Sequence, residues 1–207
     1  MARWLMAGAL LAAVVTGVVV MAQENKMSTQ KVSSGMATAV FAGGCFWCME
    51  SEYHGIPGVL STTVGFTGGT VENPSYEAVS AGGTGHVEAL QVTYDPTVVT
   101  YAQLVDIFWG NVDPFDDQGQ FCDKGEQYKA ALFVGNSAER AVAEASAKAI
   151  AEKFKRVVAT QILPVQKFWP ADEKHQAFHQ KNPLRYKYYR WGCGRDGRLE
   201  ELRRGGA

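Results

Sequence analysis

Short segments in which apolar residues alternate with small or polar residues recur along the chain from residue 37 onward. A period of two is typical of β-strands, because successive side chains of a strand point to opposite faces of its sheet. Glycine or an Asp-Pro pair closes most of these segments, as is usual where a strand runs into a turn. The alternation predicts strands at residues 37–43, 59–69, 86–96, 127–135 and 159–171.

Segments with helical spacing lie between these strands. Leu104 and Phe108 fall on one side of a helix, and Thr100 before them is a suitable N-cap, because its hydroxyl can accept a hydrogen bond from a free backbone N–H. Asn136 or Ser137 can cap the clearest helix of the chain in the same way. The spacing predicts helices at residues 45–55, 73–83, 100–112 and 136–154, with a polar loop at 113–126.

The predicted elements follow one another in the order β-α-β-α-β-α-β-α-β. Strands that alternate with helices favour a two-layer α/β sandwich of the α+β class, in which helices pack on a mixed sheet. The segment after residue 181 is rich in aromatic residues, arginine and glycine and has little period. We therefore expect it to form a long coiled tail that wraps the surface of the domain.

The N-terminal segment differs in character from the rest of the chain. An apolar run from Trp4 to Ala22 follows Arg3 and ends in a small-x-small pattern, Val20-Met21-Ala22. This pattern predicts a secretory signal peptide at residues 1–22, a flexible polar linker at 23–36 and a domain at 37–207. The protein is then expected to be exported to the periplasm. The alternative is a retained membrane anchor at residues 4–22, since the run is almost long enough to span a bilayer.

The remaining composition is that of an ordinary globular protein. The 207 residues are 46% hydrophobic and carry a formal net charge of -1, which argues against a nucleic-acid binder with its usual basic excess. A chain of this length can bury one sizeable core. Disulfide crosslinks are therefore not needed to stabilise the fold. The chain has four cysteines, Cys45, Cys48, Cys122 and Cys193, and their spacing carries the chemical information.

Cys45 follows a predicted strand and two glycines and stands at the start of a predicted helix. The N–H groups and the dipole of a helix N-terminus favour an anion, so a cysteine there tends toward the nucleophilic thiolate. Phe46 and Trp47 cannot both face the core of one helix, so one of them lies beside the sulfur or at the surface. The alternative interpretation is that Cys45 is a small buried hydrophobic residue and that the two aromatic residues fill the core around a bend.

One ionisable residue, Glu88, lies on the more apolar side of the predicted strand at 86–96. Burial would raise its pKa, and a neutral carboxylic acid in an apolar pocket can donate a proton. The alternative is a glutamate at an exposed strand edge. His175 and His179 have the i, i+4 spacing of metal ligands on a predicted helix. Because the chain has no second C-x-x-C motif, we nevertheless expect no metal site.

Six short motifs stand out when the chain is considered as a whole. They are GGCFWC at 43–48, GFTGG at 65–69, NPSYEAV at 73–79, TGHVEALQV at 84–92, FCDKGEQYKAALF at 121–133 and YYRWGCGRDGRL at 188–199. Together they resemble the peptide-methionine (S)-S-oxide reductase (MsrA) family, in the order of that family, over residues 37–202. The resemblance implies a two-layer sandwich built on a ferredoxin-like core, with a long coiled C-terminal segment.

The resemblance also implies a reaction. Cys45 would be the nucleophile that becomes a sulfenic acid, and Glu88 the acid that protonates the sulfoxide oxygen. Phe46 and Trp47 would line the pocket for the methyl group of methionine S-sulfoxide, in a protein or as the free amino acid. No metal or prosthetic group is implied. A thioredoxin-type dithiol would reset the enzyme, which we expect to act as a monomer in the repair of oxidised proteins, with no nucleic-acid partner and no membrane contact beyond the signal segment.

Tyr76, Tyr128 and Asp123 carry no distinct signal of their own, since such residues are common in loops. By the resemblance, the two tyrosines hydrogen-bond the sulfoxide oxygen, and Asp123 belongs to the same polar site. These assignments turn several weak local signals into one consistent set.

Two positions depart from the family pattern. Cys48 stands where many members have glycine, and Cys122 stands where they often have asparagine. Three cysteines are therefore candidates to resolve the Cys45 sulfenic acid. Cys48 is favoured, because residues i and i+3 of a helix lie about 5 to 6 Å apart, within the Cα range of a disulfide. Cys193 in the tail is the main rival, and Cys122 follows.

A different class of function stays open on the C-x-x-C motif alone. Cys45 and Cys48 have the strand-to-helix position found in thioredoxin-like thiol–disulfide oxidoreductases. Such an enzyme would give no role to Glu88, Tyr76 or Tyr128. A non-enzymatic metal-binding module is a third interpretation. Insulin reduction compared with methyl sulfoxide reduction separates the first two, and metal analysis tests the third.

Overall fold

The computed structural model describes Met1 and residues 35–205 of the chain. The predicted signal peptide beyond Met1, and the predicted linker up to residue 34, lie outside the described residues. In the part that is described, no helix combines the length and the apolar character needed to cross a membrane.

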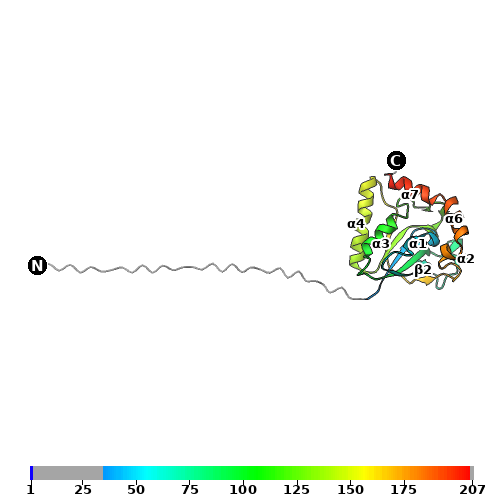
Figure 1. Ribbon diagram of the computed structural model, residues 1–207, viewed down its shortest axis with the longest axis horizontal. Coiled ribbons are helices and arrows are strands. Elements are labelled where there is room, and N and C mark those ends of the chain that lie inside the picture. Colours follow the sequence, from blue (N-terminus) through cyan, green and yellow to red (C-terminus); the bar gives the residue numbers. More distant parts are fainter. Residues whose placement is uncertain (2–34, 206–207) are drawn as a thin grey trace. The chain divides into compact units, whose positions relative to one another are not determined.

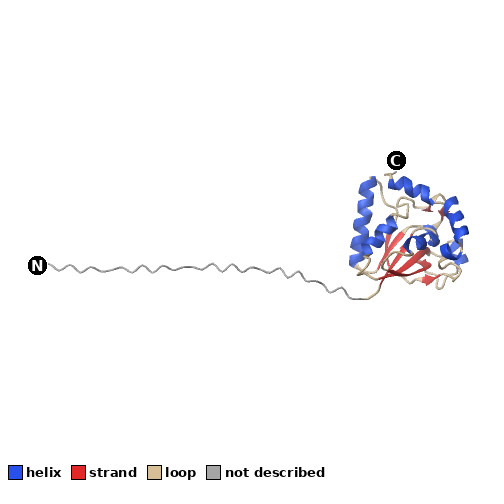
Figure 2. Cartoon of the chain, in the orientation of Figure 1, coloured by secondary structure: helices blue, strands red, loops and turns tan. Residues whose placement is uncertain are grey.

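Six strands form one mixed sheet in the order β7-β6-β1-β3-β2-β8 (Figure 2). Neighbouring strands are antiparallel throughout, except for the parallel pair β6 and β7. The strands are β1 (Ala37–Ala42), β2 (Val59–Thr67), β3 (Val87–Tyr94), β6 (Ala131–Val134), β7 (Gln161–Pro164) and β8 (Trp169–Pro170).

Helices cover one face of this sheet, and α3 and α4 lie side by side there (Figure 1). A two-stranded hairpin and a 3-10 turn, η1, lie in the segment between α3 and β6. The helices are α1 (Phe46–Tyr53), α2 (Tyr76–Ala81), α3 (Tyr101–Trp109), α4 (Ser137–Phe154), α5 (Phe178–Lys181), α6 (Pro183–Gly192) and α7 (Arg195–Arg203), and the smaller elements are β4 (Gly119–Gln120), β5 (Asp123–Lys124) and η1 (Glu126–Tyr128).

The main core lies between the sheet and these helices. Phe41 and Leu90 from the strands belong to one apolar cluster with Met49 of α1, Phe108 of α3 and Ala143 of α4. Each of these side chains is at most 1% exposed, and burying a large apolar side chain contributes roughly 1.5–3 kcal/mol. This core holds the start of α1 firmly against the sheet.

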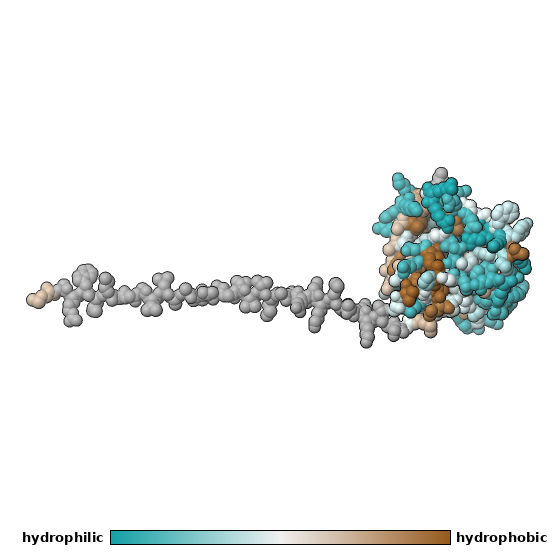
Figure 3. Space-filling model, in the orientation of Figure 1, coloured by the Kyte–Doolittle hydropathy of each residue, from teal (hydrophilic) through white to brown (hydrophobic). Residues whose placement is uncertain are grey.

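The opposite face of the sheet carries a smaller apolar cluster, which includes Val40, Ala89 and Phe133. These residues alternate along their strands with those of the main core, as the period of two predicts. In the space-filling view, hydrophobic residues reach the visible surface mainly in a strip beside α3 (Figure 3).

The predicted fold class, helices packed on a mixed sheet, is confirmed. The predicted caps are confirmed as well. The Thr100 side chain accepts a hydrogen bond from the Gln103 N–H at the start of α3. The Asn136 side chain accepts one from the Glu139 N–H at the start of α4. Both caps satisfy N–H groups that a helix leaves free at its first turn.

The single strand predicted at 159–171 is wrong, because this segment contains two short strands. β7 pairs with β6 at one edge of the sheet, whereas β8 pairs with β2 at the opposite edge. The chain therefore crosses from edge to edge between Pro164 and Trp169. A continuous apolar pattern cannot show that its two halves pair with different neighbours.

The expected coiled tail is also wrong, since residues 183–192 and 195–203 form α6 and α7. On α6, Tyr186 faces inward and is 8% exposed, whereas Leu184, Tyr188 and Trp191 are 74–82% exposed. Apolar residues thus lie on both sides of this helix. For that reason the sequence of α6 shows no helical period of apolar residues, although the segment forms a helix.

Candidate active site

Two glycines shape the turn from β1 into α1. Gly44 has a φ of 80°, in the left-handed region that favours glycine. A Cβ on Gly44 would lie 2.5 Å from Gln120 Cβ, and one on Gly43 would lie 2.4 Å from Met49 Sδ. Neither position accepts a side chain without rearrangement. This close packing brings Cys45 to the N-cap position of α1.

A small cavity of about 60 Å³ opens at the start of α1. All seven residues that the resemblance assigned to catalysis or substrate binding line this cavity, together with one tyrosine of α6 that the sequence analysis missed. The lining residues are Cys45, Phe46, Trp47, Tyr76, Glu88, Asp123, Tyr128 and Tyr189.

Glu88 is buried in this site and is 3% exposed, so it does not lie at an exposed strand edge. Its Oε2 accepts a hydrogen bond of 2.9 Å from the Phe46 N–H, the first N–H of α1. Burial raises the pKa of Glu88 to about 8, although the Phe46 N–H opposes this effect, and the negative charges of Asp123 and Cys48 add to it. The carboxyl group is therefore mostly protonated at neutral pH and can act as an acid.

Cys45 and Cys48 are free thiols, buried within one turn of each other. Burial raises the pKa of Cys45 well above its ordinary value. The hydrogen bond from Cys45 lowers the pKa of Cys48 to about 7, and the positive charges of Arg195 and Arg190 act in the same direction. Cys48 can therefore ionise near neutral pH while Cys45 keeps its proton, and a proton can pass between the two neighbouring sulfurs.

Aromatic side chains form one wall of the cavity. Trp47 stacks on Phe178 with ring centroids 3.7 Å apart and an interplanar angle of 7°. Phe46 packs against Tyr76 at 6.4 Å and is 1% exposed. The two neighbouring aromatic residues of the motif thus both reach the site, and they offer an apolar surface beside the Cys45 sulfur.

Tyr189 is the site residue that sequence reasoning did not identify. Its hydroxyl donates a short hydrogen bond to Asp123 Oδ2 and lowers the pKa of the neighbouring Cys45 thiol, against the larger effect of burial. Its ring packs edge-on against Trp47, with centroids 5.9 Å apart. In the sequence, Tyr189 is one of several aromatic residues in a segment without a period, so no local pattern distinguishes it.

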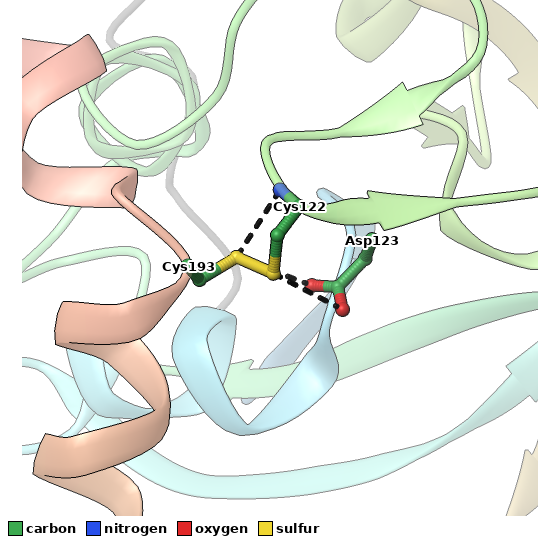
Figure 4. A group of neighbouring side chains, drawn as sticks. All are labelled: Cys122, Asp123 and Cys193. Carbon is green, nitrogen blue, oxygen red and sulfur yellow. Dashed lines mark hydrogen bonds between the residues drawn. A yellow bond between two sulfur atoms is a disulfide. The ribbon is translucent and has the colours of Figure 1, made fainter.

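The other two cysteines form a disulfide that joins α6 to the hairpin of β4 and β5 (Figure 4). Cys122 is exposed and Cys193 is half-buried. The Cys122 N–H donates to Cys193 Sγ at 3.2 Å. The two sulfurs lie 3.7 and 3.9 Å from the oxygens of Asp123. The four cysteines thus fall into two pairs, and the choice of Cys48 as the resolving residue stays a prediction.

Two groups have the composition of metal ligands. Within the described residues, Cys122, Asp123 and Cys193 have ligand atoms within 4.8 Å of one another, but both sulfurs are joined in the disulfide. His175 and His179 do not share the helix that was expected. Ala177, with a φ of 51°, separates His175 from α5. His175 stacks on Tyr76 at 4.4 Å, whereas His179 lies near Glu50.

A buried thiol pair at a helix start, a protonated carboxylic acid and an aromatic wall surround one small cavity. This arrangement defines a thiol-dependent oxidoreductase whose reaction needs a nucleophilic sulfur and a proton donor on the same substrate group.

The family model described as peptide methionine sulfoxide reductase matches residues 37–204. Peptide methionine sulfoxide reductase MsrA from Bacillus licheniformis is 48% identical over 165 residues, which cover 79% of this chain and 91% of that protein. MsrA 2 from Caulobacter vibrioides is 49% identical, over 80% of this chain and 84% of the relative. Peptide methionine sulfoxide reductase MsrA/MsrB from Vibrio cholerae is 45% identical over 86% of this chain, which spans only 48% of that longer protein.

Solved structures agree with this assignment. Methionine sulfoxide reductase A of Corynebacterium diphtheriae superposes with a TM-score of 0.67 at 33% identity, over 74% of this chain and 78% of that one. Mxr1 from Saccharomyces cerevisiae in its reduced form gives a TM-score of 0.67 at 32% identity, over 72% and 87%. The chain belongs to the peptide methionine sulfoxide reductase family, and it is a thiol-dependent reductase of the MsrA type.

Proposed function

We propose that this enzyme reduces methionine S-sulfoxide through the residues of the 60 Å³ cavity. The Cys45 thiolate attacks the sulfoxide sulfur, and Glu88 gives its proton to the sulfoxide oxygen as that oxygen gains negative charge. Tyr76 and Tyr128 donate hydrogen bonds to the same oxygen. In the adduct, the Cys45 sulfur is bonded to the former sulfoxide sulfur, which now carries a hydroxyl group. This hydroxyl group is transferred to the Cys45 sulfur as the sulfur–sulfur bond breaks, which leaves methionine and the Cys45 sulfenic acid.

The observation that carries this proposal is the shared position of Cys45 and Glu88 at the start of α1. Cys45 is the N-cap residue, and Glu88 accepts the first N–H of the same helix at 2.9 Å. A nucleophile and an acid held on one helix turn can act on the two adjacent atoms of a sulfoxide group. Holding both groups at one helix start before the substrate binds is the advantage of a preorganised site.

The cavity also accounts for selection of one epimer. Phe46 and Trp47 provide an apolar wall for the methyl group, whereas Glu88 and the tyrosines provide donors for the oxygen. Because the sulfoxide sulfur is chiral, only one epimer presents its methyl group to the wall and its oxygen to the donors while its sulfur faces Cys45. A separate enzyme for each epimer is the usual arrangement.

For the next step, we favour Cys48 as the resolving cysteine. Cys48 lies within one helical turn of Cys45, and the positive charges of Arg195 and Arg190 favour its thiolate. Attack of this thiolate on the sulfenic sulfur forms a Cys45–Cys48 disulfide, and the hydroxide leaves as water after taking up a proton. Cys193 and Cys122, which lie next to Asp123, are the alternative candidates for the resolving cysteine.

A thioredoxin-type dithiol then reduces the disulfide by thiol–disulfide exchange, with no prosthetic group. Oxidised proteins and free methionine sulfoxide are the proposed substrates, and repair of oxidised proteins is the proposed role. Export to the periplasm and a monomeric state complete the proposal. The support for export is the apolar run that ends at Ala22, with residues 4–22 as the alternative membrane anchor.

A single-turnover experiment without reductant tests this function. Fully reduced enzyme is mixed with each epimer of a methionine sulfoxide peptide, and methionine is counted per enzyme while mass spectrometry maps the cysteine linkages. We expect product from the S-epimer only, and none from Cys45→Ser above the uncatalysed level. Insulin reduction by an enzyme that leaves both sulfoxide epimers unchanged would instead support a thioredoxin-like function.

A further inference from the structure

The Tyr189 hydroxyl lies between the Cys45 nucleophile and the Asp123 carboxyl group, and all three residues line the same cavity. Its hydrogen is donated to Asp123 Oδ2, so its oxygen can accept the hydrogen of the Cys45 thiol, which lines the same cavity and belongs to the cluster that Tyr189 packs against. Tyr189 therefore offers a path for a proton from the Cys45 sulfur to the Asp123 carboxyl group. Glu88 reaches α1 from the sheet, through the Phe46 N–H, and it is not part of this path.

Tyr189 is held in this position by the inner face of α6. One turn earlier, the Tyr186 hydroxyl bonds Ser51 Oγ at 2.6 Å. The next residue, Arg190, forms ion pairs with Glu52 and with Asp196. The helix ends at Cys193, in the disulfide with Cys122. Contacts to α1, α7 and the hairpin thus fix α6 on several sides, so the Tyr189 ring has little freedom to leave the site.

We propose that Tyr189 is a catalytic residue that passes the proton of the Cys45 thiol to Asp123, which acts as the base of the reaction while Glu88 acts as the acid. The inference rests on the role of Cys45 proposed above and adds the path by which that residue becomes a thiolate.

With Asp123 as the base and Glu88 as the acid, the protons gained and lost balance over one turnover. The thiol proton moves to the Tyr189 oxygen while the Tyr189 proton moves to Asp123, which becomes neutral. The thiolate then attacks the sulfoxide sulfur, and Glu88 loses its proton to the sulfoxide oxygen. After product release, Asp123 gives up its proton and Glu88 regains one through solvent. Tyr189 itself ends the cycle unchanged.

The surroundings of the two carboxyl groups support opposite roles for them. Burial raises the pKa of Asp123, but the Tyr189 hydroxyl and the charges of Arg195 and Lys124 oppose this effect. The raised pKa makes Asp123 a better base, whereas its cationic neighbours favour the ionised form that can accept a proton. At Glu88, burial raises the pKa to about 8, and the charges of Asp123 and Cys48 act in the same direction. Cys48 is the rival acceptor of the Cys45 proton, because it exchanges a hydrogen bond with the same sulfur.

Tyr189→Phe tests the path by removing one oxygen atom and keeping the ring that packs on Trp47. The readout is the single-turnover rate of methionine formation against pH, without reductant, together with substrate affinity and the ultraviolet absorbance of the thiolate. We expect the rate near pH 7 to fall by about 10²-fold, the scale of a lost general base. We also expect the ascending limb of the profile to move to higher pH while substrate affinity is kept. Tyr188→Phe, on the exposed side of the same helix, is the matched control and should behave as wild type.

Asp123→Asn should move the same limb, and the double variant should be no slower than the slower single variant, because both residues serve one path. This carboxyl substitution also carries the test if Tyr189→Phe does not fold.

Three results would overturn the proposal. They are an unchanged pH profile in Tyr189→Phe, a loss of equal size at every pH, and a limb that moves only in Cys48→Ser. Failure of the proposed function would look different, since the wild-type enzyme would then form no methionine at all.

Discussion

The acid role of Glu88 gives a prediction with a defined magnitude. With a pKa of about 8, roughly nine-tenths of the enzyme carries the proton at pH 7, and roughly one-tenth carries it at pH 9. The single-turnover rate of the wild type should therefore fall with a midpoint near pH 8 on the alkaline side. Glu88→Gln keeps an oxygen that can accept the Phe46 N–H, so it isolates the loss of the proton. We expect it to slow the chemical step by about 10²- to 10⁴-fold and to remove the limb near pH 8.

The same raised pKa predicts that Glu88→Gln, although it slows the reaction, makes the fold more stable. The folded chain binds the Glu88 proton more tightly than the unfolded chain, in which the ordinary value is 4.5. Stability from this group is therefore fully present below pH 4.5 and is lost as the pH rises through about 8. The loss approaches about 5 kcal/mol, at about 1.4 kcal/mol for each tenfold change. Glu88→Gln is neutral at every pH, so relative to wild type it should gain stability between pH 4 and pH 9.

Two measurements test these expectations. The rate is measured by rapid-quench detection of methionine formed from a sulfoxide peptide, and the stability by urea unfolding at pH 4 and at pH 9. Substrate affinity serves as the control, since Glu88→Gln should largely keep it. A Gln variant that reacts at the wild-type rate, or that retains the alkaline limb, would refute the acid role. A variant that is no more stable than wild type at pH 9 would refute the raised pKa from which both expectations follow.

Three further predictions concern cysteine chemistry, processing and the helix start. Cys48→Ser should form about one methionine per enzyme and stop as a sulfenic acid, whereas Cys193→Ser should continue to cycle with thioredoxin; the reverse result, read by product counting, would place resolution in the tail. N-terminal sequencing of exported protein should begin at Gln23, and a chain that still starts at its first residue would favour a membrane anchor. Gly44→Ala should destabilise the fold by about 1–3 kcal/mol, since φ is 80° and the new Cβ would lie 2.5 Å from Gln120 Cβ; an unchanged urea midpoint would contradict this.

Local features of the sequence determined much of the active site. Two glycines before Cys45 allow the turn that makes this residue an N-cap, and alternation along β3 places Glu88 on the buried face of its strand. The cap at Thr100 followed from side-chain chemistry within a few residues. Such features depend on backbone geometry and on neighbours one turn or one pleat away, so they can be derived from the sequence without knowledge of the fold.

Only the tertiary structure decided how distant segments meet. The contact of Glu88 with the Phe46 N–H spans 42 residues, that of Tyr189 with Asp123 spans 66, and the Cys122–Cys193 disulfide spans 71. No period in the sequence selects Tyr189 from the tyrosines around it, because its inward direction is set by how α6 packs on α1 and the hairpin. The raised pKa of Glu88 has the same origin, since burial by surrounding elements removes the water that would stabilise its charge.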